Sequence, residues 1–127
     1  MESTQQILEE LRTLRDRGDL ETLLARYGNI DQRATAAWDD VEIVAEIGRA
    51  HSLAGNDVPV ERYFQRCAEL NPRRSAIYLC QVGWFYQRKK KWARSITWYD
   101  RALTTFPSYH LCLFRKGYCL ERLHRPR

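Results

Sequence analysis

The 127-residue sequence lacks the short motifs that mark most enzymes. It has no glycine-rich phosphate loop, no His-Glu-x-x-His pair and no nucleophile elbow, and it has only three histidines. Residues 1–6 show neither the basic nor the apolar stretch of a secretory signal, and no run of about 18 apolar residues suggests a membrane span. We therefore expect a cytoplasmic protein that is not an enzyme, needs no cofactor and has no membrane partner.

Cysteine is also sparse, and no two cysteines form a Cys-x-x-Cys pair. Cys112 and Cys119 are seven residues apart on one expected helix, about 10 Å by helical rise, which is too far for a disulfide. A zinc site that uses them with His110 and His124 is the alternative, but the spacing matches no structural zinc pattern. We expect buried, reduced thiols and no bound metal. The four cysteines are Cys67, Cys80, Cys112 and Cys119.

A repeat of about 35 residues is present instead. Gly48, Gly83 and Gly117 are 35 and 34 residues apart, and Pro72 and Pro107 are 35 apart. Such a period is typical of stacked helical hairpins, in which glycine lets two helices approach closely and proline ends a helix. No strand-like alternation competes with this pattern, so we predict an all-α fold. Stacked hairpins usually bind other chains and rarely catalyse reactions.

The middle unit resembles the tetratricopeptide repeat, W-x2-L-G-x2-Y followed by A-x3-F and P. Upstream, Val44, Gly48, His51, Phe64 and Pro72 follow the same spacing, with His51 in an aromatic position; downstream, Leu113, Gly117 and Leu120 begin a third unit. The matching residues of the middle unit are Leu79, Val82, Gly83, Tyr86, Ser95, Tyr99 and Pro107. The resemblance implies about two recognisable repeats within a superhelix of antiparallel hairpins. The RNA-reading pentatricopeptide repeats have nearly the same period, but the glycine and aromatic positions favour the tetratricopeptide pattern.

About seven helices are expected in a single domain: a degenerate hairpin over 1–40, repeats over 41–74 and 75–109, and a half repeat over 110–127. Ser3 and Gln6 form a capping-box signature, and a short helix should end near Gly28. A further helix is expected from about Ala36 to Ala54, and the next should be capped by Asp57 with Pro59 in its first turn.

Charge divides the sequence unevenly. Residues 1–60 carry a net charge of −6, whereas residues 61–127 carry +11. The densest basic run lies at the turn of the middle hairpin, and cations interleaved with an aromatic are typical of single-stranded nucleic-acid binding. A solvated turn is the simpler interpretation. The candidate nucleic-acid residues are Lys89, Lys90, Lys91, Trp92 and Arg94.

A second candidate site follows one face of the first helices. Ile77, Cys80, Trp84 and Arg88 recur 34 residues later as Leu111, Phe114, Tyr118 and Arg122. The resemblance implies that this stripe lines a concave groove that contacts bound peptide, although a stripe of aromatics at helical spacing is also compatible with a core. The predicted groove residues are Arg49, Ile77, Cys80, Trp84, Arg88, Leu111, Phe114, Arg115, Tyr118 and Arg122.

These side chains indicate what the groove would bind. Some tetratricopeptide proteins bind acidic chaperone tails through Lys and Asn, which this stripe does not offer. Aromatic residues edged by arginine instead suit a peptide or an amphipathic helix with acidic flanks. We therefore expect a protein-interaction scaffold or chaperone-like adaptor, with single-stranded nucleic-acid binding as the alternative. We also expect residues 110–124 to self-associate or to continue into a longer array, because the last helix lacks a polar outer face.

Overall fold

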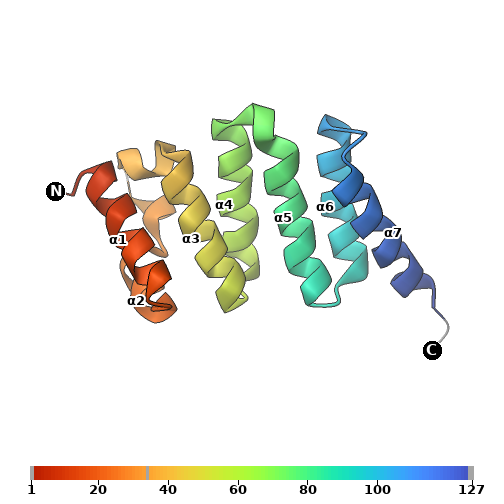
Figure 1. Ribbon diagram of the computed structural model, residues 1–127, viewed down its shortest axis with the longest axis horizontal. Helices are drawn as coiled ribbons and strands as arrows, with labels where there is room; N and C mark the ends of the chain where they lie inside the picture. Colours follow the sequence, from red (N-terminus) through yellow and green to blue (C-terminus); the bar gives the residue numbers. More distant parts are fainter. Residues whose placement is uncertain (1, 34, 126–127) are drawn as a thin grey trace. The chain divides into compact units, whose positions relative to one another are not determined.

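The computed structural model describes residues 2–33 and 35–125. These residues form a series of helical hairpins (Figure 1). No strand occurs among these residues, so the predicted all-α fold is confirmed. The α-helices are α1 (Thr4–Asp16), α2 (Leu20–Tyr27), α3 (Val41–Ala54), α4 (Asp57–Leu70), α5 (Ser75–Arg88), α6 (Trp92–Thr105) and α7 (His110–His124). Short 3₁₀ helices cover Ile30–Gln32, Ala36–Asp39 and Pro72–Arg74.

The chain forms two compact units, unit 1 (Met1–Leu70) and unit 2 (Asn71–Arg127). The boundary between the units also divides the charge of the chain. Residues 1–70 carry a net charge of −6 and residues 71–127 carry +11, the same values as on the two sides of residue 60. The single domain and repeat boundaries expected from sequence are not tested by this division and stay a prediction.

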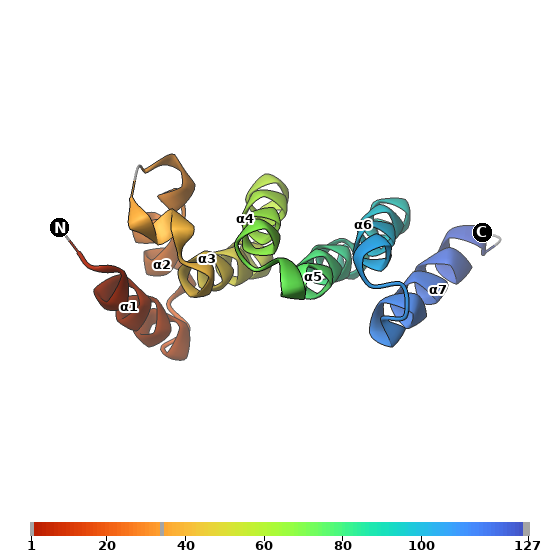
Figure 2. The same ribbon diagram turned by 90° about the horizontal axis from the view of Figure 1, so that it is seen from above.

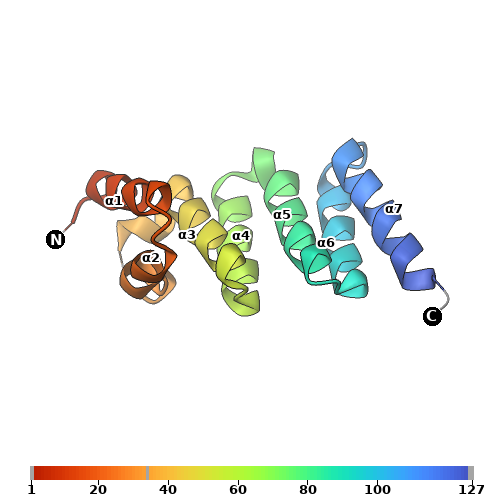
Figure 3. The same cartoon turned by 60° about the horizontal axis from the view of Figure 1, so that its bottom comes forward.

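Unit 1 begins at a capping box. The Ser3 hydroxyl accepts a hydrogen bond from the Gln6 amide at 3.2 Å, and the Gln6 side chain accepts one from the Ser3 amide at 2.8 Å, as predicted. In Figure 3, α3 runs beside α4, and the two helices pack closely. A Cβ placed on Gly48 would lie 3.2 Å from the Cβ of Tyr63, so glycine is what allows this approach.

Two boundaries in unit 1 differ from the sequence prediction. The helix expected from Ala36 is a 3₁₀ helix up to Asp39, and α3 starts at Val41 because the Asp40 carboxylate accepts from two amides of its first turn. Asp57 lies inside α4 as its first residue and is not the capping residue before it, while Pro59 does lie in the first turn.

Unit 2 is a hairpin of α5 and α6 followed by α7. Figure 2 shows α5 and α7 on one side of the unit and α6 on the other. A Cβ on Gly83 would lie 2.5 Å from Cε1 of Tyr99, and the Ser95 hydroxyl donates to the Gly83 carbonyl at 2.7 Å. The glycine and the small residue of the repeat pattern therefore meet at the closest point between α5 and α6.

The cysteines are free and buried, as expected. Burial raises the pKa of the Cys67 and Cys119 thiols. No cluster of three or more His, Cys, Asp or Glu suited to a metal ion occurs in the described part of the chain. Within the same residues, no helix has both the length and the apolarity needed to cross a membrane.

Candidate functional site

The turn between α5 and α6 is held by its own backbone. The amides of Lys89 and Lys91 donate to the Tyr86 carbonyl, and the Lys90 amide donates to the Gln87 carbonyl at 2.9 Å. Lys90 adopts a left-handed conformation with φ of 60°, which is uncommon for a residue with a Cβ. This residue reverses the chain so that Trp92 begins α6 directly beside the end of α5.

A pocket of about 330 Å³ opens at this turn within unit 2. Its wall combines three aromatic rings with three basic side chains, and no acidic residue lines it. The lining residues are Trp84, Gln87 and Arg88 of α5, Lys90 of the turn, Trp92 of α6, and Tyr118 and Arg122 of α7. The structure thus brings residues of the two candidate sites, which were predicted separately, into one pocket.

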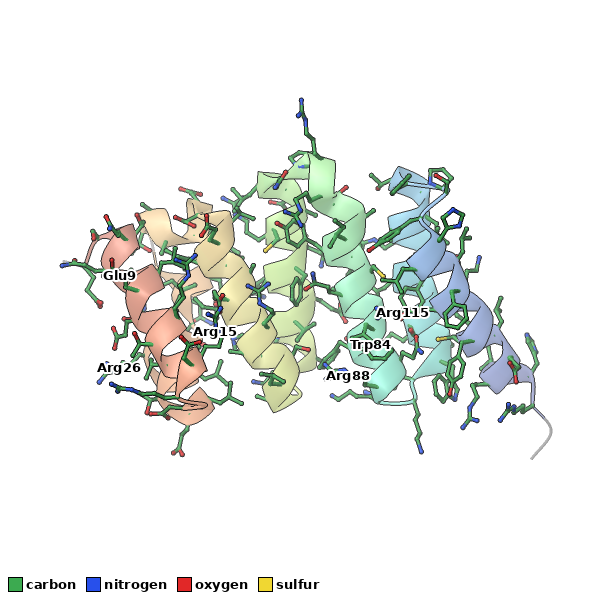
Figure 4. The ribbon with its side chains drawn as sticks, viewed as in Figure 1. Glu9, Arg15, Arg26, Trp84, Arg88 and Arg115 are labelled. Carbon is green, nitrogen blue, oxygen red and sulfur yellow. The ribbon has the colours of Figure 1, made fainter. Side chains whose placement is uncertain are left out.

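Two of the three rings meet edge to face, and guanidinium groups lie over the rings. The rings of Trp92 and Tyr118 meet at 72° with centroids 5.9 Å apart, and the Arg122 guanidinium lies 5.5 Å from the Trp92 ring. The Arg115 guanidinium lies 4.1 Å from the centroid of the Trp84 ring. Figure 4 labels Arg115 and Trp84 together with Arg88. These distances place the guanidinium groups within the range of cation–π attraction to the rings.

Gln87 was not predicted and lies in the wall of the pocket. Its side-chain oxygen accepts from the Tyr99 hydroxyl at 2.6 Å and from the Cys119 thiol at 3.4 Å, so buried groups fix its orientation. Helical spacing could have predicted that Gln87 shares this face, since Trp84, Gln87 and Arg88 are i, i+3 and i+4 on one helix.

The remaining groove residues of unit 2 differ in exposure. Phe114 is 74% exposed and Leu111 is 43% exposed, whereas Ile77 is half-buried. Trp84 and Tyr118 are 38% and 41% exposed, so these aromatics are not closed into a core. Cys80 is 2% exposed and therefore supports the face from beneath without contributing to its surface.

The sulfur chemistry under this face concerns Cys80 and Cys112. The neighbouring Cys112 thiol and the charge of Arg115 lower the pKa of the Cys80 thiol, and the interaction with Cys80 raises the pKa of Cys112. The Arg115 guanidinium lies 4.0 Å from the Cys80 sulfur. Arg115 therefore links a buried thiol to the exposed Trp84 ring.

Arg49, the last predicted groove residue, belongs to unit 1. It is exposed on α3 and donates to the Glu46 carboxylate at 3.1 Å, which also accepts from Arg15 at 2.5 Å. Figure 4 shows Arg15 on α1. Arg49 also lines a separate pocket of about 300 Å³ in unit 1, together with Arg15 and Glu46.

The rest of the basic run lies against its own hairpin. The Lys89 ammonium is 4.7 Å from the Phe85 ring, and the Arg94 guanidinium and Lys91 ammonium are 4.8 Å and 5.9 Å from the Tyr86 ring. Both rings are buried, so these three cations cover the end of the hairpin core. Lys90 and Trp92 are the members of the run that line the pocket.

No protein-family model matches the chain. A stretch of 78 residues, 61% of the chain, is 32% identical to anaphase-promoting complex subunit 3 of Schizosaccharomyces pombe. The matched stretch amounts to 12% of that subunit's length. Together with the all-helical hairpins, this similarity is compatible with a tetratricopeptide-like protein.

Proposed function

We propose that the chain is a protein-interaction module that binds an acidic segment of a partner protein at the pocket of unit 2. The observation that carries the proposal is the wall of three rings and three basic side chains without an acidic residue. Trp, Tyr and Arg are the residue types that dominate binding energy at protein interfaces. The cations would contact carboxylates, while the rings would cover the apolar part of the segment.

Two further features support this function. The exposed side chains of Phe114 and Leu111 on α7 extend the apolar surface of the unit. The similar yeast protein is, by its name, a subunit of a complex, and this agrees with a role in binding other proteins. A scaffold of this kind needs no catalytic group or cofactor.

Single-stranded nucleic acid is the second candidate ligand. Lys90 and Trp92 line the pocket, and a ring next to a cation can stack a base and bind its phosphate. The two ligands differ in their response to salt, because nucleic-acid affinity falls steeply with salt through counterion release, whereas a partly apolar peptide contact keeps part of its affinity.

The test is selection of short random peptides on the wild-type chain, followed by titration of the strongest peptide by fluorescence anisotropy. We expect the selected peptides to combine Asp or Glu with an apolar residue. Trp84→Ala and Tyr118→Ala should each weaken binding by about 2 kcal/mol or more. Because both side chains are partly exposed, each change should lower the free energy of unfolding by less than about 1.5 kcal/mol.

Phe106→Ala is the matched control. Phe106 is 49% exposed in the same unit and stacks on Tyr109 at 5.7 Å, but it does not line the pocket. Its removal should leave peptide binding unchanged. A chain that selects no acidic peptides, yet binds oligo-dT with an affinity that Trp84→Ala and Lys90→Glu abolish, would replace the proposal with nucleic-acid binding.

A further inference from the structure

A second pocket lies within unit 1, where α1, α2 and α3 come together (Figure 1). Its volume is about 300 Å³. The wall contains Leu14 of α1, Leu23 of α2 and Ala50 of α3, which are all buried, whereas Leu53 at the end of α3 is 71% exposed. The pocket is therefore an apolar hollow between packed helices, with a buried floor and an exposed leucine at its mouth.

The turn between α1 and α2 keeps this hollow open. Gly18 follows α1 in the left-handed conformation with φ of 68°, and its amide donates to the Arg15 carbonyl at 2.9 Å. A Cβ placed on Gly18 would meet no atom within 4 Å. Because this lining residue has no side chain, the adjoining part of the mouth is not covered.

The polar part of the wall consists of two guanidinium groups and one carboxylate. The Glu46 carboxylate, which is buried, accepts from Arg15 at 2.5 Å and from Arg49 at 3.1 Å, so these three side chains sum to a charge of +1. Nε of Arg15 also lies 3.3 Å from Oδ1 of Asp16, which does not line the pocket. Arg49 is therefore the less neutralised of the two cations.

The volume and the wall indicate what the pocket can hold. A dry apolar cavity of about 150 Å³ binds benzene, so a pocket of about 300 Å³ accommodates an apolar body of roughly two fused rings. Apolar pockets of this size with a few convergent polar groups are typical of small-molecule sites. Guanidinium groups only donate hydrogen bonds, and the one carboxylate already accepts from both, so the polar end of a ligand should be an anionic acceptor.

We propose that the pocket of unit 1 binds a small amphiphilic molecule with an apolar body of about two rings and a carboxylate that contacts Arg49. The net charge of −6 on unit 1 opposes an anion at long range, so binding relies on contacts inside the pocket and not on steering. This site is distinct from the pocket of unit 2 and does not depend on the proposed function.

The probe is β-naphthoate, titrated into the isotope-labelled full chain and followed by two-dimensional NMR. Each amide reports on its own surroundings, so binding in unit 1 is fitted separately from any binding at the basic pocket of unit 2. We expect saturable shifts at Gly18, Ala50 and Leu53, with a dissociation constant below about 1 mM for a ligand of this size. The neutral β-naphthamide should bind more weakly, and the β-naphthylmethylammonium cation more weakly still.

Two variants test the apolar wall. Ala50→Leu places a larger side chain in the pocket, and Leu53→Gln removes an apolar side chain from its mouth, so each should weaken β-naphthoate by about fivefold or more. Since Leu53 is exposed, Leu53→Gln should keep the fold even if Ala50→Leu lowers stability. Val58→Gln is the matched control, because Val58 is 67% exposed in the same unit and does not line this pocket.

Arg49→Gln tests the contact with the carboxylate. It should weaken β-naphthoate by about fivefold or more and change β-naphthamide much less, because only the anion gains from the guanidinium charge. Glu46 keeps its ion pair with Arg15 in this variant. Arg12→Gln is the control: the Arg12 side chain is as exposed as that of Arg49, but it pairs with Glu42 at 2.8 Å and does not line the pocket.

Four results would overturn the proposal. The first two are absence of saturable shifts at the pocket of unit 1, and an affinity for β-naphthoate that Ala50→Leu and Leu53→Gln leave unchanged. The third is failure of Arg49→Gln to discriminate between the anionic and neutral probes. The fourth is that acidic peptides selected on the chain shift the same amides and are weakened by Leu53→Gln, which would make the pocket part of a peptide-binding surface.

Discussion

At the scale of single residues, His51 shows how a polar ring occupies an aromatic position of the repeat. It is buried, and its ring lies 5.1 Å from that of Tyr63. Nε2 is 2.9 Å from the Gly28 carbonyl oxygen, and Nδ1 is 3.1 Å from the Asn56 amide nitrogen. The neutral tautomer that is protonated on Nε2 satisfies both contacts. Burial accordingly lowers the pKa of the His51 ring.

This lowered pKa predicts a loss of stability in mild acid. Since the unfolded chain takes up the proton near the ordinary pKa of 6.5 and the folded chain only at lower pH, the stability contributed by neutral His51 is present above pH 6.5 and is lost as the pH falls toward the folded pKa. Urea unfolding between about pH 7 and pH 5 should show this loss, at no more than about 1.4 kcal/mol per pH unit for one proton.

His51→Gln is the control for this effect. The variant should be less stable than the wild type at pH 7 but should lose less stability on acidification. The carboxyl groups of Glu10 and Asp31 also have lowered pKa values. The stability that they contribute is lost only as the pH falls below their ordinary pKa values of 4.5 and 3.8, which lie below the range from pH 7 to pH 5. Identical pH profiles for the two proteins would contradict the assignment.

At the scale of helices, Gly83 and Gly117 occupy equivalent positions in the repeat but different surroundings. A Cβ on Gly83 would enter the Tyr99 ring, whereas a Cβ on Gly117 would meet open space. We expect Gly83→Ala to destabilise the fold, because an overpacking cost of roughly 1 to 3 kcal/mol exceeds the helix-propensity gain of up to about 1 kcal/mol. Gly117→Ala should instead stabilise it by up to about 1 kcal/mol.

Urea denaturation followed by circular dichroism measures both changes. Each variant serves as the control for the other, since the same atom group is added to a helix of the same unit. Equal effects of the two substitutions would show that the surroundings of the two glycines do not differ as described.

The helices themselves were largely predictable because their ends are local. Ser3 and Gln6 define the start of α1, and Gly55, with φ of 81°, ends α3 in the left-handed conformation that glycine adopts readily. The 3₁₀ segment at Ala36–Asp39 was missed because its composition resembles that of a helix start, and only the Asp40 side chain sets where the α-helix begins.

The pocket was less predictable because it depends on the packing of three helices. Helical spacing identified Trp84, Arg88, Tyr118 and Arg122 as one stripe, but not that Lys90 and Trp92 adjoin them. That arrangement follows from the left-handed turn at Lys90, which the sequence does not mark with a glycine.

At the scale of the whole molecule, the charges of the two units differ in sign, −6 in unit 1 and +11 in unit 2. A field of this size accelerates the encounter of unit 2 with an acidic ligand, and it is screened by salt. The association rate of an acidic peptide should therefore fall as ionic strength rises, while the dissociation rate should depend mainly on contacts in the pocket.

Two double variants separate the field of unit 2 from direct contact. Arg88→Gln with Arg122→Gln removes two charges from the pocket wall, and Arg73→Gln with Arg74→Gln removes two charges from the exposed 3₁₀ helix of the same unit. In stopped-flow measurements at low salt, both pairs should lower the association rate, because each removes the same net charge from unit 2. Only the pocket pair should also raise the dissociation rate, because Arg122 is held over Trp92 and Tyr118 where the ligand would be bound. An association rate that is independent of salt in the wild type, or a dissociation rate that rises equally in both variants, would show that the cations of the pocket do not contact the bound peptide.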